Sequence, residues 1–139
     1  MKTPKQRAWD SFSKWVRARD AHLYGDGIYA PCVTCGNVYP TTRLQGGHWL
    51  PRNKTGTLLD ASNVHAQCVG CNKYGRGMIA EHAAAIVRLH GDAELETLTR
   101  LSRKVVKVRD WGFWERFFDE ALIMRRWHIN PWRGFVEGA

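Results

Sequence analysis

The sequence predicts an α+β protein that is mostly helical, with one small core in its middle. Three observations predict this fold class. Both ends of the 139-residue chain carry apolar residues at helical spacing. Residues 28–67 are rich in glycine, proline, threonine and asparagine, which is typical of short strands and loops. All four cysteines lie in two Cys-x-x-Cys pairs in or next to this region, so a shared site is expected there.

The first expected helix lies at the N-terminus. Thr3 followed by Pro4 is typical of an N-cap and the first residue of a helix. The apolar residues that follow recur at helical spacing: Ala8, Phe12, Trp15, Val16 and Leu23. The stretch YGDG, residues 24–27, then ends the helix. Residues 1–27 are therefore expected to form a basic N-terminal helix.

Three further helices are expected in the second half of the chain. Residues 78–90 are rich in alanine and stop at Gly91. Asp92 can cap a next helix with one apolar stripe, made of Leu95, Leu98, Leu101, Val105 and Val108. Asp110 can cap a last helix that runs through Trp111, Trp114, Phe117, Phe118, Leu122 and Trp127. Such aromatic spacing, within residues 91–139, is more often a core or a subunit interface than a ligand site.

The cysteines could form a disulfide staple, a redox centre or a metal frame. Cys32 and Cys35 make the first pair, Cys68 and Cys71 the second, with 32 residues between the pairs. The start of the chain lacks the apolar region of a signal peptide, and no apolar run approaches the roughly 20 residues of a membrane span. The expected compartment is therefore the cytosol, which disfavours disulfides. A thioredoxin-type motif requires a βαβ context that is missing here. The spacing thus predicts one structural Zn²⁺ bound by four thiolates.

The charge of the chain is high and unevenly spread. The net charge is +8, from 21 basic and 13 acidic residues. Residues 1–31 hold six basic against three acidic residues, residues 32–77 five against one, and residues 78–139 ten against nine. The excess therefore surrounds the cysteines, as expected of a protein that binds a phosphate backbone. A merely solubilising basic surface is the other interpretation.

The residues between and beside the cysteines carry the candidate chemistry. His48 follows two glycines, so a phosphate could approach its imidazole, and a neutral imidazole can take a proton from water. Asn72 follows the last cysteine directly, and its amide oxygen could ligate Mg²⁺. Asn63 could orient the imidazole or a phosphate by hydrogen bonding. His65 could be a metal ligand, a phosphate contact or a structural histidine.

The order of these residues resembles a known family. The stretches FSKWVRARDAHLYGDGIYAPCVTCG, GGHW and NVHAQCVGCNKYGRG carry the resemblance. A Cys-x-x-Cys pair, then His, then Asn, then a second pair followed by Asn resembles the zinc-framed HNH, or ββα-metal, nucleases. Among these are phage Holliday junction resolvases of the endonuclease VII type. The chain is more closely similar to phage recombination proteins of the NinG (Rap) family, over roughly residues 7–80.

This resemblance implies a fold and a reaction. The implied fold is a small ββα-metal (HNH) core over residues 28–90, framed by the Cys₄ zinc site, with its α element beginning at about Cys71. The implied protein is a DNA endonuclease that acts in the cytoplasm of the phage's bacterial host and nicks branched DNA, such as Holliday junctions, by phosphodiester hydrolysis. His48 would be the general base and Asn63 the orienting residue. Asn72 would be a ligand of a catalytic Mg²⁺ or Mn²⁺.

One position departs from the pattern of the resembled proteins. Many HNH nucleases place an acidic metal ligand immediately before the base, where this chain has Gly47. Asp60 is the only carboxylate within residues 32–77. Asp60 or His65 could supply the missing ligand, His48 could bind the metal itself, or substrate phosphate could hold it.

Basic residues near this core are the expected DNA contacts. They are Arg43, Arg52, Lys54, Lys73 and Arg76, with Lys14, Arg17 and Arg19 on the first helix. The sequence leaves two other functions open. One is a non-catalytic zinc-framed DNA-binding protein or recombination mediator, and the other is an HNH nuclease that nicks DNA without regard to structure.

The expected assembly is a homodimer. A four-way junction has approximate two-fold symmetry and its resolution takes two nicks, whereas one chain offers one site. The aromatic segment 91–139 is the expected interface. A mostly helical monomer could instead pack these side chains against the helix that carries Phe12 and Trp15.

Overall fold

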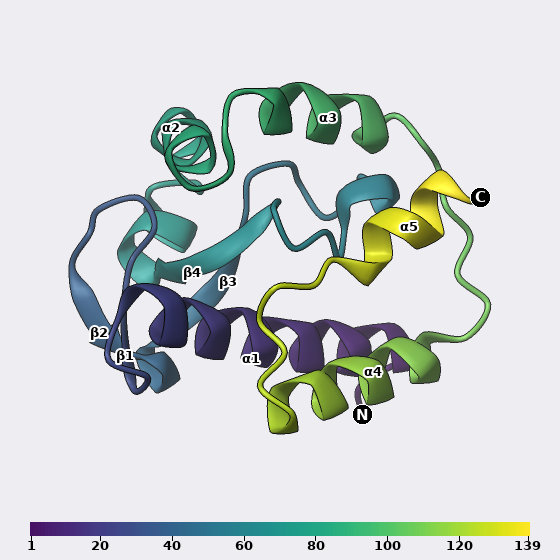
Figure 1. Cartoon of the computed structure of the whole chain (residues 1–139), viewed down its shortest axis with the longest axis horizontal. Helices are drawn as coiled ribbons and strands as arrows, with labels where there is room; N and C mark the ends of the chain where they lie inside the picture. The colour runs from purple at the N-terminus through teal and green to yellow at the C-terminus, as the bar shows by residue number, and fades with distance from the viewer.

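The long helix α1 (Pro4–Tyr24) runs along one side of the molecule, with two short strand pairs and the other helices arranged around it (Figure 1). The structure is a computed structural model and describes residues 1–139. The strands are β1 (Tyr29–Pro31), β2 (Val38–Pro40), β3 (Leu44–His48) and β4 (Val64–Cys68). The other α-helices are α2 (Ile79–His90), α3 (Ala93–Ser102), α4 (Trp111–Ile123) and α5 (Pro131–Glu137). The predicted fold class, α+β and mostly helical, is confirmed.

Both ends of α1 agree with the sequence signals. The Thr3 hydroxyl accepts a hydrogen bond from the Gln6 backbone N–H at 3.1 Å, and the Gln6 side-chain oxygen accepts from the Thr3 N–H at 2.7 Å. These two bonds satisfy N–H groups that the first turn of a helix cannot pair internally. The helix stops at Tyr24, before the expected glycines. None of the helices is both long and apolar enough to cross a membrane.

The strands pair as two separate antiparallel ribbons. In the second ribbon, Gly47 lies opposite His65 and His48 lies opposite Val64. Because side chains alternate between the two faces of a strand, His48 and His65 point to opposite faces. His48 stacks on Trp9 of α1, and His65 contacts α2. The β3–β4 ribbon is therefore a layer between α1 and α2 (Figure 1).

The helical element after β4 begins near Cys71, where the α element of the core was expected. It is one π-helical turn, η3 (Gly70–Tyr74), and not an α-helix. The chain then turns sharply, with Met78 in the left-handed region at a φ of 49°, and α2 begins at Ile79. The paired strands β3 and β4 and the helical turn after them follow the order of a ββα-metal core. This order alone does not establish that core, which remains a prediction.

The predicted helix after Asp92 needs three corrections. Helix α3 ends at Ser102, so the expected apolar stripe stops at Leu101. Val105 is 93% exposed, because the neighbouring Val106 turns inward and its N–H donates to the Thr55 hydroxyl at 2.9 Å. Asp92 precedes α3 but makes no capping hydrogen bond.

Helix α4 begins as predicted but ends early. The Asp110 carboxylate accepts from the Phe113 N–H at 3.0 Å, which is the expected cap. The helix ends at Ile123, so Trp127 lies in a loop. Helix α5 was not predicted, although Pro131 at its first position after Asn130 is a helix-start signal.

Aromatic side chains of the C-terminal helices complete the core on α1. Phe118 lies 4.8 Å from Phe12 and 5.4 Å from Trp15 between ring centroids, and the Trp15 indole N–H donates to the Arg126 carbonyl at 2.8 Å. Phe118 and Trp132 are fully buried. Much of the aromatic surface expected at a dimer interface is thus buried within one chain, so the homodimer remains a prediction on symmetry grounds alone.

Candidate functional site

The four cysteines form one cluster at the end of the molecule where the two ribbons meet. Cys32 directly follows β1, Cys35 lies in the loop before β2, Cys68 ends β4 and Cys71 lies in η3. Their sulfurs all lie within 4.8 Å of one another, and none is in a disulfide. A tetrahedral zinc with Zn–S bonds of about 2.3 Å requires sulfurs about 3.8 Å apart, and Cys35 Sγ lies 3.9 Å from Cys68 Sγ. The cluster could therefore bind a zinc ion.

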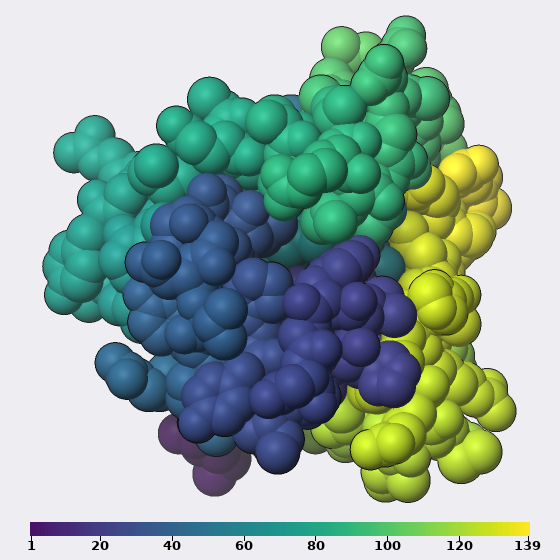
Figure 2. All heavy atoms as spheres, turned by 60° about the vertical axis from the view of Figure 1, so that its left-hand side comes forward, coloured from purple at the N-terminus to yellow at the C-terminus, as the bar shows by residue number.

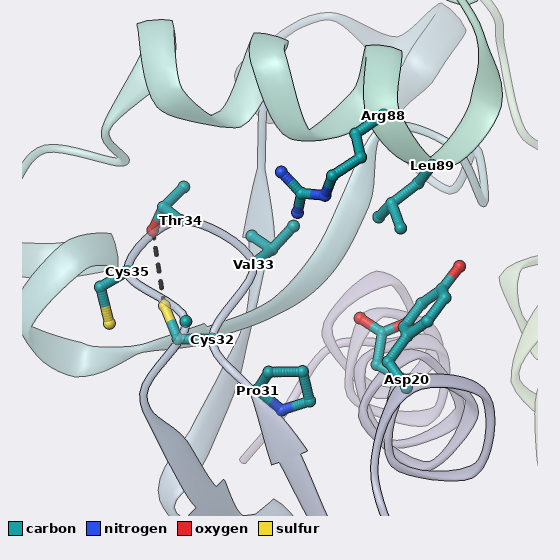
Figure 3. A pocket seen from close by; sticks show the side chains of 10 residues that line it. Asp20, Pro31, Cys32, Val33, Thr34, Cys35, Arg88 and Leu89 are labelled. Carbon is teal, nitrogen blue, oxygen red and sulfur yellow. Dashed lines mark hydrogen bonds between the residues drawn. The ribbon is translucent and has the colours of Figure 1, made fainter.

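Hydrogen bonds prepare this cluster for a cation. The Cys68 N–H lies 3.3 Å from Cys32 Sγ, and the Thr34 hydroxyl lies 3.4 Å from the same sulfur (Figure 3). Burial raises the pKa of Cys32, but bonds from the backbone of Cys35 and Cys68 and from Thr34 outweigh it and lower that pKa to about 6. Burial and the neighbouring thiols raise the pKa of Cys35 to about 12. Four thiolates can thus coexist here only with a cation among them, as at a Cys₄ zinc site.

The loop that carries the first cysteine pair faces the C-terminal ends of α1 and α2 across a hollow of ≈ 430 Å³. Asp20 and Tyr24 of α1 and Arg88 and Leu89 of α2 line this hollow together with the loop. Figure 2 shows this blue loop region on the surface beside the teal segment that follows β4. The cysteine cluster itself brings together two segments that are distant in the sequence, the loop between β1 and β2 and the end of β4 with η3.

His48 lies at the end of β3 with one ring nitrogen fixed. Its Nε2 lies 3.0 Å from the Leu58 carbonyl oxygen. A carbonyl can only accept, so Nε2 carries the hydrogen and Nδ1 carries the lone pair of the neutral ring. The Trp9 ring stacks on the imidazole, with centroids 4.6 Å apart and planes 23° from parallel. Burial lowers the pKa of His48 to about 4. The imidazole is thus neutral at physiological pH, in the tautomer that leaves Nδ1 free to accept a proton.

A basic groove runs past this histidine. Two adjoining hollows share Gly46, Arg52 and Asn72, and we call them together the His48 groove. The lining side chains with polar groups include Arg17, Gln45, His48, Arg52, Asn72 and Arg76. The Arg52 guanidinium lies 4.2 Å from the centre of the Trp9 ring, on which His48 also stacks. Three arginines and no carboxylate line the groove, so it suits an anion such as a phosphodiester.

Asn72 reaches the groove from η3. It follows Cys71 directly, so the cysteine cluster fixes its backbone. Its Nδ2 donates to Gln45 Oε1 at 2.8 Å. That bond directs the amide nitrogen to Gln45 and leaves Oδ1 as the free acceptor, which is the atom that a hard cation would use.

Asn63 does not touch His48 but holds the loop that does. Its Oδ1 accepts from the Leu50 N–H at 2.8 Å, and its Nδ2 donates to the carbonyls of Leu50 and Thr57, both at 3.1 Å. Thr57 precedes Leu58, whose carbonyl binds His48. The fully buried Asn63 thus positions the segment that orients the imidazole.

Replacing Asn63 by alanine should destabilise the protein and loosen His48. The change leaves one N–H and two carbonyls without their partner, and each buried unpaired group costs about 1–3 kcal/mol. We expect the free energy of unfolding to fall by about 2–4 kcal/mol, measured by urea denaturation. Asn53→Ala, in the exposed part of the same loop, is the matched control. An Asn63→Ala protein as stable as wild type would contradict this role.

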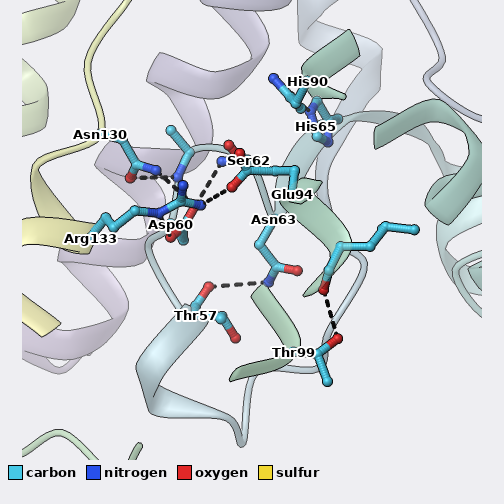
Figure 4. A network of polar contacts seen from close by, with 12 residues as sticks. Thr57, Asp60, Ser62, Asn63, His65, His90, Glu94, Thr99, Asn130 and Arg133 are labelled. Atoms are coloured by element: carbon cyan, nitrogen blue, oxygen red, sulfur yellow. Dashed lines mark hydrogen bonds and ion pairs between the residues drawn. The ribbon is translucent and has the colours of Figure 1, made fainter. Parts of the chain in front are cut away.

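Asp60 is not available as a metal ligand, which corrects one sequence expectation. It is fully buried, and its two oxygens bind the Arg133 guanidinium at 3.1 Å (Figure 4). Its Oδ1 also accepts from Asn130 Nδ2 and from the Ser62 N–H, both at 2.9 Å. Arg133 pairs with Glu94 as well. Asp60 therefore ties α5 to the loop before β4 and does not line the His48 groove.

His65 is likewise not available as a metal ligand. It is fully buried, with Nδ1 3.0 Å from His82 Nε2 and Nε2 2.9 Å from His90 Nε2. Both ring nitrogens are used in hydrogen bonds, so neither is free for a metal. The sequence left three interpretations of His65 open, and this geometry supports the structural one.

The predicted DNA-contacting side chains divide into two groups. Arg19 is 5% exposed and donates to the carbonyls of Ala61 and Val64 at 2.7 and 2.8 Å, so it is a structural residue, contrary to the prediction. Its Nε also pairs with Asp20 at 2.9 Å. Arg17 lines the groove while donating to the Ser13 carbonyl at 3.1 Å. The remaining candidates are exposed: Lys14, Arg43, Arg52, Lys54, Lys73 and Arg76.

The structure gives a physical cause for the glycine that precedes His48. A Cβ on Gly47 would lie 2.0 Å from Gln67 Oε1 and 2.8 Å from Gln67 Cβ. The side chain of Gln67, on the facing strand, thus fills the room that an acidic residue at position 47 would need. Gln67 is fully buried, and its Oε1 has no hydrogen-bond partner in the protein.

Some of these features carry no sequence signal. The Leu58 contact uses a backbone carbonyl, which any residue could supply. Trp9 belongs to the apolar pattern of α1 and could not be distinguished from a core residue. Gln67 stands between His65 and Cys68 and matched no expected ligand position.

Fold and site together define a small basic protein whose cysteine cluster could bind zinc and lies beside an arginine-lined groove. The chain belongs to the family described as Bacteriophage Lambda NinG protein, whose family model matches residues 2–110. It is 24% identical to Protein ninG of Salmonella phage P22 and 23% identical to that of Escherichia phage 933W, in each case over 94 residues and 67% of this chain. The aligned part covers 42% and 43% of these relatives, so the chain spans less than half of their length. No solved structure matches the chain.

Proposed function

We propose that this chain is a metal-dependent DNA endonuclease of phage recombination that nicks branched DNA, such as Holliday junctions. The observation that carries the proposal is the state of His48. Its Nε2 binds a backbone carbonyl, so its unprotonated Nδ1 is available in an arginine-lined groove. A neutral, oriented imidazole beside a phosphate site is the arrangement that general-base hydrolysis of a phosphodiester requires.

In this proposal His48 Nδ1 takes a proton from the attacking water. The bond from Nε2 to the Leu58 carbonyl orients the ring and stabilises the imidazolium that forms. The stacked Trp9 limits tilting of the ring. Arg52 and Arg76 line the groove beside the imidazole, where they would bind the phosphates that flank the cut.

The groove also offers an oxygen ligand for a divalent ion. The only group of three or more His, Cys, Asp or Glu side chains that could hold a metal is the cysteine cluster. At the groove, Asn72 Oδ1 is a free amide oxygen. Neutral oxygens fit Mg²⁺ or Mn²⁺, which keep several waters and bind substrate phosphate. Bound there, such an ion would stabilise the charge of the transition state and of the leaving 3′-oxygen.

The proposed role of the cysteine cluster is structural. Four thiolates leave a zinc ion no open position. The zinc would instead hold β4 and η3 in place, and through them Asn72. We further propose that two copies act together, since resolving a four-way junction takes two symmetric nicks.

A panel of DNA substrates tests the proposal. The zinc-loaded protein is incubated with linear, forked and four-way DNA of matched sequence in Mg²⁺, and the cuts are mapped. We expect paired nicks near the branch point of the junction and little cutting of linear DNA. Equal cutting of all three would indicate a nonspecific nuclease. Salt-sensitive binding without cutting would favour a DNA-binding module.

The cleavage rate should not show the pH dependence expected of a histidine with an unshifted pKa. Only neutral His48 can act as a base, and burial lowers its pKa to about 4. The rate should therefore not fall through His48 protonation between about pH 8 and 6, whereas a base with a pKa of about 6.5 would lose about fourfold. Single-turnover rates at saturating Mg²⁺ measure this, with circular dichroism as the folding control at each pH. A half-maximal rate near pH 6.5 would contradict the lowered pKa of His48.

The same pKa shift gives the sign of a stability change. In the unfolded chain His48 binds its proton near pH 6.5, but in the folded protein only near pH 4. The unfolded state thus binds more protons between these values. The contribution of neutral His48 to the free energy of unfolding is therefore fully present above about pH 6.5 and is lost as the pH falls towards 4.

A further inference from the structure

A cluster of basic side chains lies outside the His48 groove, at the end of α3 and on the segment that joins α3 to α4. The near-neutral total of residues 78–139 conceals it, because five of their ten basic residues and none of their nine acidic ones fall within residues 100–109. We call these five exposed side chains the 100–109 strip: Arg100, Arg103, Lys104, Lys107 and Arg109. In Figure 1 the segment leaves α3 at the top and runs down the right-hand edge towards α4.

No ion pair within the protein neutralises the strip. None of its five side chains lies within salt-bridge distance of a carboxylate. Two nearby acidic residues are used elsewhere: Asp110 caps α4 and pairs with Arg116 at 3.8 Å, and Glu94 pairs with Arg133. A merely solubilising surface mixes charges of both signs. A run of one sign that has no partners instead attracts an anionic polymer.

Trp49 connects the strip to the His48 groove. It lines the groove and also a second hollow of ≈ 600 Å³. The other residues that line the second hollow belong to α3 or follow it directly: Leu95, Glu96, Thr99, Arg100 and Arg103. The two guanidinium groups outnumber the single carboxylate, that of Glu96, so the hollow as a whole favours an anion. A phosphate backbone that follows the groove past Trp49 thus meets further positive charge.

The strip is held against the loop between β3 and β4. The Val106 N–H donates to the Thr55 hydroxyl at 2.9 Å, and the Val106 side chain is buried. Gly56 makes room for the same segment, because a Cβ there would lie 2.0 Å from the Leu101 carbonyl oxygen and 2.8 Å from that of Lys104. The backbone of the strip is therefore fixed in the free protein, so that little order has to be gained when a ligand binds.

The loop that holds the strip is itself basic. Arg52 lines the groove, and Lys54 is exposed two residues later. Thr55, which binds the Val106 N–H, follows Lys54 directly. Positive side chains thus lead from the groove to the strip by two routes, past Trp49 and through Lys54.

We propose that the 100–109 strip binds a second stretch of DNA phosphate backbone, next to the one in the His48 groove. The inference rests on the proposed function and deepens it, because it takes DNA as the ligand of that groove. Contacts to the backbone position DNA without reading its sequence, which suits a protein that recognises branched shape. The strip adjoins the groove that DNA must enter to be cut, and this favours DNA over an acidic protein as its partner.

Binding of a four-way junction to the zinc-loaded protein, measured without Mg²⁺, tests the strip separately from cleavage. Arg103→Gln combined with Lys104→Gln removes two charges from exposed side chains of the strip. We expect the affinity at roughly 0.1 M salt to fall about tenfold. The slope of log affinity against log salt concentration should become shallower by about 2, because each lost phosphate contact removes roughly 0.9.

Arg125→Gln combined with Arg126→Gln is the matched control. This pair is also adjacent, basic and exposed, and it follows the end of α4 as the strip pair follows α3. In Figure 1 the end of α4 lies at the bottom and α3 at the top. The control should leave both the affinity and the salt slope close to wild type. Equal losses in the two variants would overturn the proposal, because net charge alone would then explain them.

A photo-crosslinking amino acid locates the contact by a second route. Val105 is 93% exposed within the strip, and Ile123, 79% exposed at the end of α4, is the matched position. With p-benzoylphenylalanine in place of Val105 we expect a crosslink to the labelled junction, and with the same residue in place of Ile123 we expect none. Thermal denaturation checks the folding of each variant. Should the strip variant fail to fold, the crosslink at position 105 decides alone.

Cleavage separates this inference from the proposed function. If the folded strip variant binds the junction like wild type while the wild type cuts it, the inference fails and the proposed function survives. The strip would then be a solvated surface or a site for an acidic protein. If the strip variant binds weakly as expected but DNA is never cut, the proposed function fails and the inference survives.

Discussion

Removing zinc from the cysteine cluster is expected to unfold the middle of the chain, residues 28–77. We expect one tightly bound Zn²⁺ per chain with all four cysteines as ligands, because their sulfurs lie within 4.8 Å of one another. Zinc binding to such sites contributes about 10–16 kcal/mol, whereas small domains are stable by only about 5–15 kcal/mol. The hydrophobic contacts between α1 and α4 could keep those helices together. Amide NMR with and without a chelator measures which segments lose structure.

Substituting a cysteine provides the matching genetic test. Cys35→Ser alters the exposed member of the cluster and should lower zinc affinity and thermal stability together. Ser62→Ala, outside the cluster, serves as a comparison. Elemental analysis that finds no zinc in the native protein, or mass spectrometry that finds two disulfides, would contradict this role of the cysteines.

Replacing His48 by alanine is expected to lower DNA cleavage by about 10²-fold or more, since general-base catalysis contributes on that order. DNA affinity should change little, because the groove keeps Arg17, Arg52 and Arg76. Single-turnover cleavage and a binding titration at the same salt concentration separate the two effects. His128→Ala, at an exposed histidine in the loop after α4, is the matched control.

Asn72→Ala should act on the metal as well as on the rate. We expect slower cleavage at a fixed Mg²⁺ concentration and partial recovery as Mg²⁺ is raised, because an oxygen ligand is lost. A His48→Ala protein that cuts at the wild-type rate would show that the base is assigned wrongly. An Asn72→Ala protein with an unchanged Mg²⁺ requirement would exclude its ligand role.

The sequence predicts what depends on local patterns and fixed spacing. Neighbouring residues predict the Thr3–Pro4 start of α1 and the Asp110 cap of α4, and the structure confirms both. The spacing within the two Cys-x-x-Cys pairs predicts that the four cysteines share one site, and their sulfurs do lie together. The mostly helical α+β class follows for the same reason. Asp110 succeeds as a cap where Asp92 does not, because the backbone of Asp110 is non-helical (φ −131°, ψ 85°), as a cap requires, whereas that of Asp92 is already helical (φ −60°, ψ −40°).

Other features depend on contacts between distant segments. Asp60 looked available because it is the lone carboxylate of its region, but Arg133 lies 73 residues away in the sequence and takes both of its oxygens. Arg19 sits in the basic pattern of α1, yet β4 and the loop before it offer carbonyls that draw its guanidinium inside. Val106 is buried in place of the expected Val105, and its N–H donates to the distant Thr55 hydroxyl. No local pattern carries these partners.

The most direct test of the proposed function is a cleavage assay on a 5′-labelled four-way junction with and without Mg²⁺, followed by analysis of the product ends. Hydrolysis with a 3′-oxygen leaving group predicts ends with a 5′-phosphate and a 3′-hydroxyl, formed only when Mg²⁺ or Mn²⁺ is present. His48→Ala should form few or none of them under the same conditions. A zinc-loaded, folded protein that binds the junction but leaves every strand intact in Mg²⁺ and in Mn²⁺ would contradict the account.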